Sequence, residues 1–227
     1  EIFTELTHDY EARAAAIAMR GIDRMYADGE QRRIFFEDLY AELNVHGALP
    51  EFYLLGNERQ LLFQARTHLP DYLAQPMQDW GVLARMERQE GSVAEFVPNG
   101  AQDWDYVVGQ AVRYAPSTGD ATSTIEGYAV FVMPAQELVK RLQTGEKMHV
   151  VIVDRAGRVP FSTTTIFRDP VFHKIVPELA GAQGLVEVDG QQFYVTQEPV
   201  LDGRFAVYAI LPVGSRIAQF ATGAAIL

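Results

Sequence analysis

The feature of the sequence that most constrains the fold is an order of predicted elements that occurs twice. In the first half of the chain, two apolar runs flank a Gly-Asn turn at residues 56–59, a pattern typical of a β-hairpin. A helix is expected over 70–88 because apolar residues recur there at helical spacing. Three strands separated by polar turns are then expected between residues 93 and 133.

The same order begins again at His149. Residues 149–163 have the pattern of a second hairpin, 170–179 are expected to be helical, and the strands within 185–211 are joined at Asp-Gly turns. Residue identities are not repeated, so the order of the elements is the whole evidence. We therefore expect an α+β protein with two tandem strand-rich modules, at 46–134 and 147–213. The alternative is one continuous α+β domain.

A helical stalk is expected before the first module, over residues 1–45. Apolar residues recur there every three or four positions and form one stripe of an amphipathic helix. Gly29 interrupts the pattern, and Asp28 followed by Gln31 has the form of a capping box that would start a second helix. The stripe consists of Leu6, Tyr10, Ala14, Ile17, Gly21 and Met25 in the first helix and Phe35, Leu39 and Leu43 in the second.

Charge and composition argue against several classes of function. The formal net charge is −11, from 19 Lys and Arg against 30 Asp and Glu, and it repels the phosphate backbone of nucleic acids. The absence of cysteine removes disulfide frameworks, thiolate nucleophiles and cysteine-rich zinc sites. The sequence contains no phosphate-binding loop, dinucleotide fingerprint or nucleophile elbow. We expect no nucleic-acid partner, no cofactor and no catalytic residue.

The five histidines do not form a metal-binding pattern. They are far apart, and none belongs to a His-x-x-x-His or His-Glu-x-x-His motif. We therefore expect no metal site. A soluble α+β hydrolase that uses scattered carboxylates would leave no motif in the sequence, and it stays open as an alternative.

The last residues change in character. The sequence contains no run of about 18 apolar residues, so no segment of it is expected to span a bilayer. After Arg216, however, residues 217–227 are uncharged and increasingly apolar. We interpret 214–227 as an exit segment toward a transmembrane helix, as in an excised ectodomain. The alternative is an ordinary C-terminal helix.

Three stretches carry a resemblance to a known family. Residues 127–142 pass from a strand into a short helix, and this helix belongs to a connecting segment at 135–146. Residues 149–163 follow with the pattern apolar-apolar-Asp-x-x-Gly-x-apolar. This passage resembles the junction between the two halves of a double Cache domain. Residues 197–212 resemble the closing hairpin of the second half.

The resemblance implies a PAS-like fold, in which a long N-terminal helix precedes two modules with antiparallel sheets. It also implies an extracytoplasmic sensor that has transmembrane helices at both ends and feeds a histidine kinase, a diguanylate cyclase or a chemotaxis region. The membrane-distal module, here 46–134, usually holds the small-molecule pocket, and 147–213 would be membrane-proximal. The Arg-x-Trp-Tyr signature of amino-acid-binding members is missing from 86–96, so amino-acid recognition by that route is not expected.

Strand alternation predicts which side chains share a face in the first module. Phe63 and its neighbours of the same parity suit packing on the N-terminal helix, whereas Arg66 and His68 lie on the other face. In a later strand, Gly109 belongs to a face of small residues and Tyr106 to a larger mixed face. The mixed faces would form a cup with a few polar groups among aromatic rings, as small-molecule sites have.

The expected ligand residues of this cup are Arg66, His68, Trp104, Tyr106, Gln110 and Tyr128. Arg66 can hold a carboxylate through two hydrogen bonds. Tyr106 and Trp104 can stack on or enclose a ligand, while Gln110 and Tyr128 can orient it. For each residue the alternative is an ordinary half-exposed side chain of the sheet.

The sequence thus predicts the non-enzymatic, periplasmic ligand-sensing ectodomain of a bacterial membrane receptor. We expect it to bind a small molecule, for example an organic acid, in the distal module and to form a homodimer through the N-terminal helix. One alternative is an ectodomain that reads a soluble periplasmic binding protein through its surface. The other is the hydrolase mentioned above.

Overall fold

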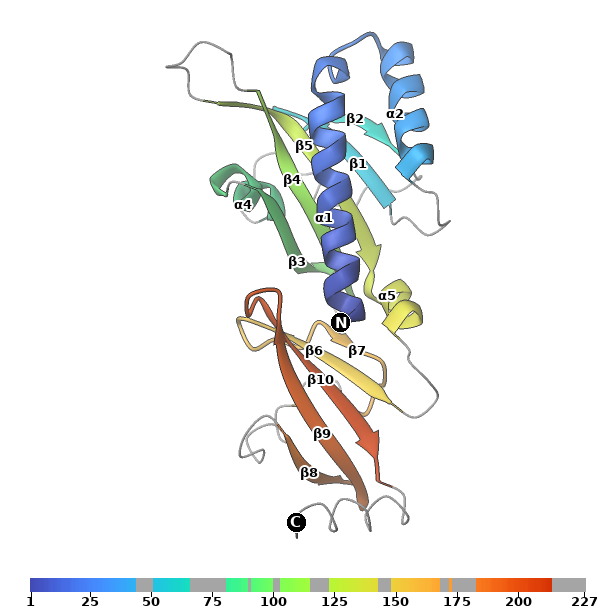
Figure 1. The fold of residues 1–227 in the computed structure, drawn as a ribbon, viewed down its shortest axis with the longest axis vertical. Coiled ribbons are helices and arrows are strands. Elements are labelled where there is room, and N and C mark those ends of the chain that lie inside the picture. Colours follow the sequence, from blue (N-terminus) through green and yellow to red (C-terminus); the bar gives the residue numbers. More distant parts are fainter. Residues whose placement is uncertain are drawn as a thin grey trace. The chain divides into compact units, whose positions relative to one another are not determined.

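The protein consists of two compact units, residues 1–134 and 135–227. The computed structural model describes residues 1–43, 51–65, 81–89, 91–99, 103–114, 123–142, 148–167, 172 and 183–213. Each unit contains an antiparallel sheet of five strands, and the first unit begins with a long helix (Figure 1). The predicted α+β architecture with two antiparallel sheets is therefore confirmed.

The first sheet has the strand order β2-β1-β5-β4-β3, and all neighbouring strands are antiparallel. The first strand of the unit therefore lies beside its last, and the predicted hairpin joins β1 to β2. The strands are β1 (Glu51–Gly56), β2 (Leu61–Gln64), β3 (Ser92–Asn99), β4 (Asp103–Tyr114) and β5 (Thr124–Pro134).

The helix α1 (Ile2–Gly21) covers one face of this sheet, which we call the helix face (Figure 1). The contact consists largely of aromatic rings. The ring of Phe3 lies 6.3 Å from that of Phe96 and 5.2 Å from that of Tyr106, and Tyr10 stacks on Phe131 at 5.9 Å. Burial of these rings fixes the helix on the sheet, since each large aromatic side chain removes a large apolar area from water.

The chain turns back at the α1–α2 corner, by which we mean residues 22–32. It contains the short 3₁₀ helix η1 (Ile22–Arg24) and the start of α2 (Gly29–Leu43). The carboxylate of Asp28 accepts hydrogen bonds from the backbone N–H groups of Glu30 and Gln31, both at 3.1 Å, as an N-cap does. The predicted break near Gly29 and the start of a second helix at Asp28 are confirmed.

The second sheet has the order β7-β6-β10-β9-β8, the order of the first sheet with each strand replaced by its counterpart. The predicted repeat of elements is thus confirmed for the strands, and the predicted short connecting helix is α5. Of the helix predicted over 170–179, only Phe172 lies within the described residues. The elements are α5 (Ala135–Leu142), β6 (His149–Asp154), β7 (Phe161–Ser162), β8 (Gln183–Val188), β9 (Gln191–Val200) and β10 (Phe205–Pro212).

Candidate functional site

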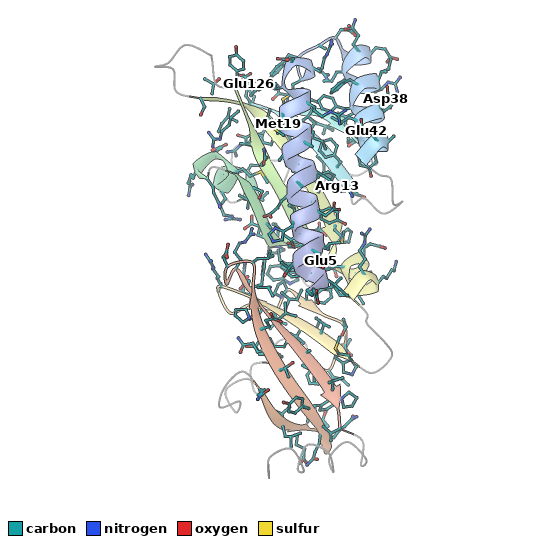
Figure 2. The ribbon with its side chains drawn as sticks, in the orientation of Figure 1. Glu5, Arg13, Met19, Asp38, Glu42 and Glu126 are labelled. Atoms are coloured by element: carbon teal, nitrogen blue, oxygen red, sulfur yellow. The ribbon has the colours of Figure 1, made fainter. Side chains whose placement is uncertain are left out.

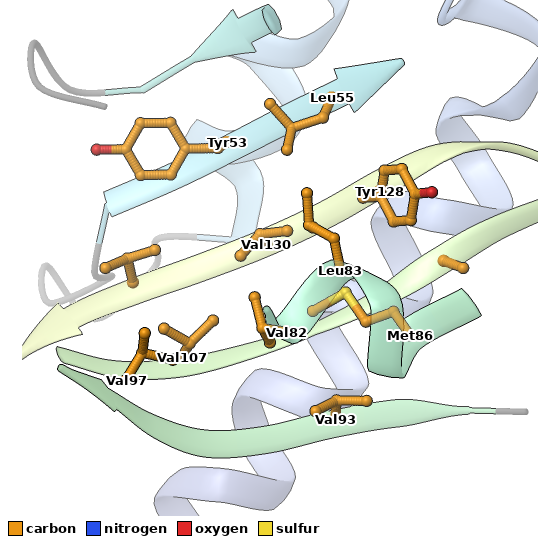
Figure 3. Packing of buried hydrophobic residues seen from close by; sticks show 12 residues of the cluster. Tyr53, Leu55, Val82, Leu83, Met86, Val93, Val97, Val107, Tyr128 and Val130 are labelled. Carbon is orange, nitrogen blue, oxygen red and sulfur yellow. The ribbon is translucent and has the colours of Figure 1, made fainter. Parts of the chain in front are cut away.

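The face of the first sheet opposite α1 carries the candidate site, and we call it the cup face. The helix α4 (Val82–Arg88) packs on this face (Figure 3). Only α4 of the helix predicted over 70–88 lies within the described residues. The cup face is lined by Tyr53 and Leu55 of β1, Tyr128, Val130 and Val132 of β5, Val107 and Ala111 of β4, Val93 and Val97 of β3, and Val82, Leu83 and Met86 of α4.

A charged cluster lies at one end of this apolar face, and we call it the Glu87 cluster. The Oε1 atom of Glu87 accepts a hydrogen bond from the Tyr128 hydroxyl at 2.6 Å and another from Nη2 of Arg59 at 2.7 Å. The side chain of Arg59 is 16% exposed and that of Glu87 is 34% exposed. The carboxylate is therefore accessible to solvent while both of its partners are largely enclosed.

The fold holds Glu87 by its backbone as well as by its side chain. Nη2 of Arg113 in β4 donates to the carbonyl oxygens of Glu87 at 2.7 Å and Met86 at 3.2 Å, at the C-terminal end of α4. The last carbonyls of a helix have no partner within the helix and carry its negative dipole end, so a guanidinium suits this position. Glu87 is thus held through both its backbone and its side chain.

Arg59 comes from the turn between β1 and β2. Its backbone N–H donates to the carbonyl of Gly56 at 2.9 Å, and its φ is +63°. Few residues other than glycine adopt a positive φ, because the side chain then crowds the backbone. The turn places the guanidinium over Glu87 at the cost of this local strain.

The structure shifts the pKa values of Glu87 and Tyr128, the two acidic groups of the Glu87 cluster, in opposite directions. Burial tends to raise the pKa of Glu87, but the hydrogen bonds from Tyr128 and Arg59 outweigh it and hold that pKa below its ordinary value. Burial, together with the bond to Glu87, raises the pKa of Tyr128 to about 12. At neutral pH the cluster therefore contains an ionised carboxylate and a neutral phenol that donates to it.

The two predicted tyrosines lie on opposite faces of the sheet. Tyr128 lies on the cup face, within the Glu87 cluster. Tyr106 lies on the helix face, where its hydroxyl is 2.6 Å from the hydroxyl of the buried Thr7. Trp104 and Gln110 have the parity of Tyr106 in β4 and so share its face; both are half-buried. The cup expected from Tyr106, Trp104, Gln110 and Tyr128 together is not formed.

The prediction that the larger, mixed face of β4 forms the cup is wrong, because that face packs against α1. In the structure the small face receives α4 instead. A Cβ on Gly109 would lie 2.5 Å from the carbonyl oxygen of Ala129 and 2.8 Å from Cε of Met86. The side of β4 that carries Gly109 therefore makes room for a methionine of the cup, and the larger residues meet α1.

The remaining predictions concern β2 and the residues that follow it. Phe63 in β2 packs against Phe36 of α2 with ring centroids 5.9 Å apart, so its predicted helix-facing orientation is confirmed. Arg66 and His68 follow this strand and lie outside the described residues. Their expected contact with a ligand stays a prediction.

Sequence reasoning missed Arg59, Glu87 and Arg113. Arg59 was assigned to a hairpin turn and Glu87 to the end of an amphipathic helix, where charged residues are common. No local pattern indicates that these two side chains meet, because the pairing depends on where α4 crosses the sheet. Local sequence patterns therefore could not predict the Glu87 cluster.

Within the described ranges, no group of three or more His, Cys, Asp or Glu side chains could hold a metal ion. No helix in the same ranges is long and apolar enough to cross a membrane.

Comparison with known proteins identifies the fold. No protein-family profile and no curated protein sequence matches the chain. Solved structures do match. The ligand-binding domain of the Pseudomonas fluorescens chemoreceptor CtaA in complex with L-serine has a TM-score of 0.67 and 11% identity, covering 92% of this chain and 90% of that one.

Two further chemoreceptor domains are similar. The sensory domain of Campylobacter jejuni Tlp3 with isoleucine bound has a TM-score of 0.64 and 11% identity, covering 96% of this chain and 89% of that one. The ligand-binding domain of Pseudomonas aeruginosa PctC in complex with GABA has a TM-score of 0.61 and 16% identity, with coverages of 92% and 94%. The chain has the fold of these sensor domains, and the expected double PAS-like, double Cache architecture is confirmed.

Proposed function

We propose that this chain is the extracytoplasmic, non-enzymatic sensor of a bacterial membrane receptor and that its cup face binds a small molecule. The observation that carries the proposal is the Glu87 cluster at the edge of an apolar face lined by Tyr53 and Tyr128. Small-molecule sites combine an apolar surface with a few fixed polar groups in this way. The fold shared with chemoreceptor ligand-binding domains supports the same function.

The charges of the cup favour a ligand that carries both an amine and a carboxylate. Glu87 offers a carboxylate to an ammonium group, and Arg59 offers a guanidinium whose planar donors fit a carboxylate. The similar domains were solved with L-serine, isoleucine and GABA, which all have these two groups. Since the usual amino-acid signature is missing, recognition would rest on Arg59, Glu87 and Tyr128. The predicted Arg66 and His68 belong to the same proposal.

A thermal-shift panel of the amino acids, GABA, simple amines and organic acids tests the proposal. We expect at least one compound with an amine and a carboxylate to raise the melting temperature of the unit with residues 1–134. At a hundredfold excess over Kd the stabilisation is about 2.7 kcal/mol, which corresponds to a shift of roughly 5 to 10 °C. No stabilisation by any compound would count against ligand binding, and stabilisation by organic acids alone would move recognition to Arg66.

We also propose that two copies associate through α1, because that helix has an apolar seam on its outer side. Ala12, Ala15 and Met19 of α1 follow the three-and-four spacing of helices that pair, and Ile22 at the start of η1 continues it. Ala12 is exposed and Met19, labelled in Figure 2, is 74% exposed. A second copy would remove this seam from water, and alanines allow two helices to approach closely.

Replacing Met19 by Glu is expected to weaken the dimer at least about tenfold, because the substitution places a charge in an apolar seam. Sedimentation equilibrium over a range of protein concentrations measures the effect. Leu185→Glu is the matched control, since Leu185 is 55% exposed and lies in the other unit. A wild-type chain that stays monomeric at the highest concentration, or a Met19 variant that dimerises equally well, contradicts the proposal. If no dimer forms but a soluble periplasmic protein binds, the alternative function is supported, in which the chain recognises that protein through its surface.

A further inference from the structure

The turn between β1 and β2 is held from both faces of the first sheet. On the cup face, Arg59 of this turn forms the ion pair with Glu87. On the other side, the backbone N–H of Asn57 in the same turn donates to the hydroxyl of Tyr26 at 3.2 Å. A single short turn thus connects the candidate ligand site to the α1–α2 corner.

Tyr26 also fixes the start of β5. Its hydroxyl donates to the carbonyl oxygen of Glu126 at 2.7 Å. Glu126 comes two residues before Tyr128, which supplies the other hydrogen bond to Glu87. The Tyr26 hydroxyl therefore holds the end of β1 and the start of β5, which are neighbouring strands. Both adjoin the Glu87 cluster, since Arg59 lies in the turn after β1 and Tyr128 lies in β5.

Arg32 makes a second connection between the corner and the sheet. Its Nη1 atom donates to the carbonyl oxygens of Met25 at 3.2 Å and Ala27 at 3.3 Å, and its Nε atom donates to that of Leu62 in β2 at 3.2 Å. The guanidinium thus ties the inside of the corner to the strand that follows the turn.

The packing leaves little room for the corner and the strands to move independently. Gly127 in β5 lies opposite Gly56 in β1, and a Cβ on Gly127 would overlap Cε of Met25 and the carbonyl oxygen of Leu55. Met25 itself is fully buried. Close-packed contacts of this kind transmit a displacement, because packed interiors are hard to compress.

We infer that Tyr26 and Arg32 are positioning residues that couple the state of the Glu87 cluster to the α1–α2 corner. This inference rests on the proposed function, and it assigns the regulation of that site. A ligand that draws Glu87 or Arg59 to itself releases the β1–β2 turn, where Arg59 has a positive φ. The turn then relaxes, and the hydrogen bond from the Asn57 N–H to the Tyr26 hydroxyl carries the change to residues 22–32. Two sites are coupled when both favour the same one of two arrangements of a shared element. Here the two sites are the Glu87 cluster and the α1–α2 corner, and the shared element is the β1–β2 turn.

The coupling can be tested without knowing the ligand, by using Glu87→Gln to open the cluster. Hydrogen exchange of the amides within 22–43 is followed by mass spectrometry. We expect at least about fivefold faster exchange at the corner in Glu87→Gln. The same substitution is then made in a Tyr26→Phe background, where the connection is already broken. Exchange at the corner should differ by less than about twofold between the double variant and Tyr26→Phe alone. Arg59→Ala, which removes the cation that pairs with Glu87, is the second variant that opens the cluster, should Glu87→Gln fold poorly.

Two control variants match these changes. Glu95→Gln removes the ion pair of Arg85 with Glu95, which also joins α4 to the sheet, and Tyr194→Phe removes a tyrosine hydrogen bond in the other unit. Neither should change exchange at the corner. Unchanged exchange of 22–43 in both Glu87→Gln and Arg59→Ala, or an equal change in Glu95→Gln, overturns the inference.

The same measurements separate this inference from the proposed function. L-Serine and GABA serve as probes of binding, and exchange at the corner reports coupling. If neither probe binds but Glu87→Gln still alters the corner, the coupling stands and the ligand proposal is weakened. If a probe binds and the corner does not respond to either the probe or Glu87→Gln, binding stands and the coupling is wrong.

Discussion

Replacing Gly127 by alanine is expected to lower the free energy of unfolding of the first unit by about 3 kcal/mol or more. The added Cβ would overlap the carbonyl oxygen of Leu55 and Cε of Met25. The methionine can rotate away, but the carbonyl belongs to the paired strand β1 and cannot move without breaking the sheet. The penalty therefore comes from backbone displacement where the end of β1 pairs with β5, the central strand of the sheet.

Urea denaturation followed by tryptophan fluorescence measures this loss. Both tryptophans, Trp80 and Trp104, belong to residues 1–134, so their emission reports on the first unit alone. Gly29→Ala is the matched control, because nothing lies within 4 Å of a Cβ at that position and alanine favours a helix. We expect it to be neutral or stabilising by up to about 1 kcal/mol. A Gly127→Ala variant that loses less than about 1 kcal/mol would show that β1 and β5 can separate locally.

Replacing Glu87 by alanine is expected to weaken binding of the cognate ligand about a hundredfold, or about 3 kcal/mol. The substitution removes the carboxylate that a ligand amine would contact. It also deprives Arg59 and the buried Tyr128 hydroxyl of the acceptor that orients them. Removing one member of a hydrogen-bonded charged group costs more than the contact itself, because its partners lose their compensation.

Isothermal titration with the best compound of the panel measures the change in affinity. Glu95→Ala is the control, since it removes another ion pair of α4, with Arg85, outside the Glu87 cluster. Equal weakening in both variants would indicate a general loss of α4 packing. Tyr128→Phe separates the roles further, because it removes one hydroxyl from the cluster and leaves the ring on the cup face.

The pH dependence of stability gives an independent check on Glu87. Its pKa is lower in the folded protein than its ordinary value of 4.5, so folding favours the ionised form. The stability that this provides is present above pH 4.5 and is lost as the pH falls through the folded value. The difference in the free energy of unfolding between wild type and Glu87→Ala should therefore become smaller as the pH falls below 4.5.

The sequence was sufficient for the order of the elements but not for the site. The hairpins, the helix break at Asp28 and the repeat of strand order follow from local patterns, because turns and capping residues act within a few positions. Which face of β4 meets α1 does not follow, since Gly109 and Tyr106 each suit a helix of the right shape. The pairing of Arg59 with Glu87 is a contact between distant parts of the chain, and local periodicity carries no information about such contacts.

The placement of β1 beside β5 also has a consequence for how the first unit forms. The central strand pair joins the earliest strand of the sheet to the latest, so it cannot assemble until the chain has been made through residue 134. Pairing between strands so distant in sequence has a large loop-closure entropy and folds slowly. The β3–β4 and β4–β5 pairs are local and can form early, and β1 then completes the sheet. A nascent chain therefore holds an unpaired edge on β5 during synthesis, and that edge must be shielded from other chains until β1 docks.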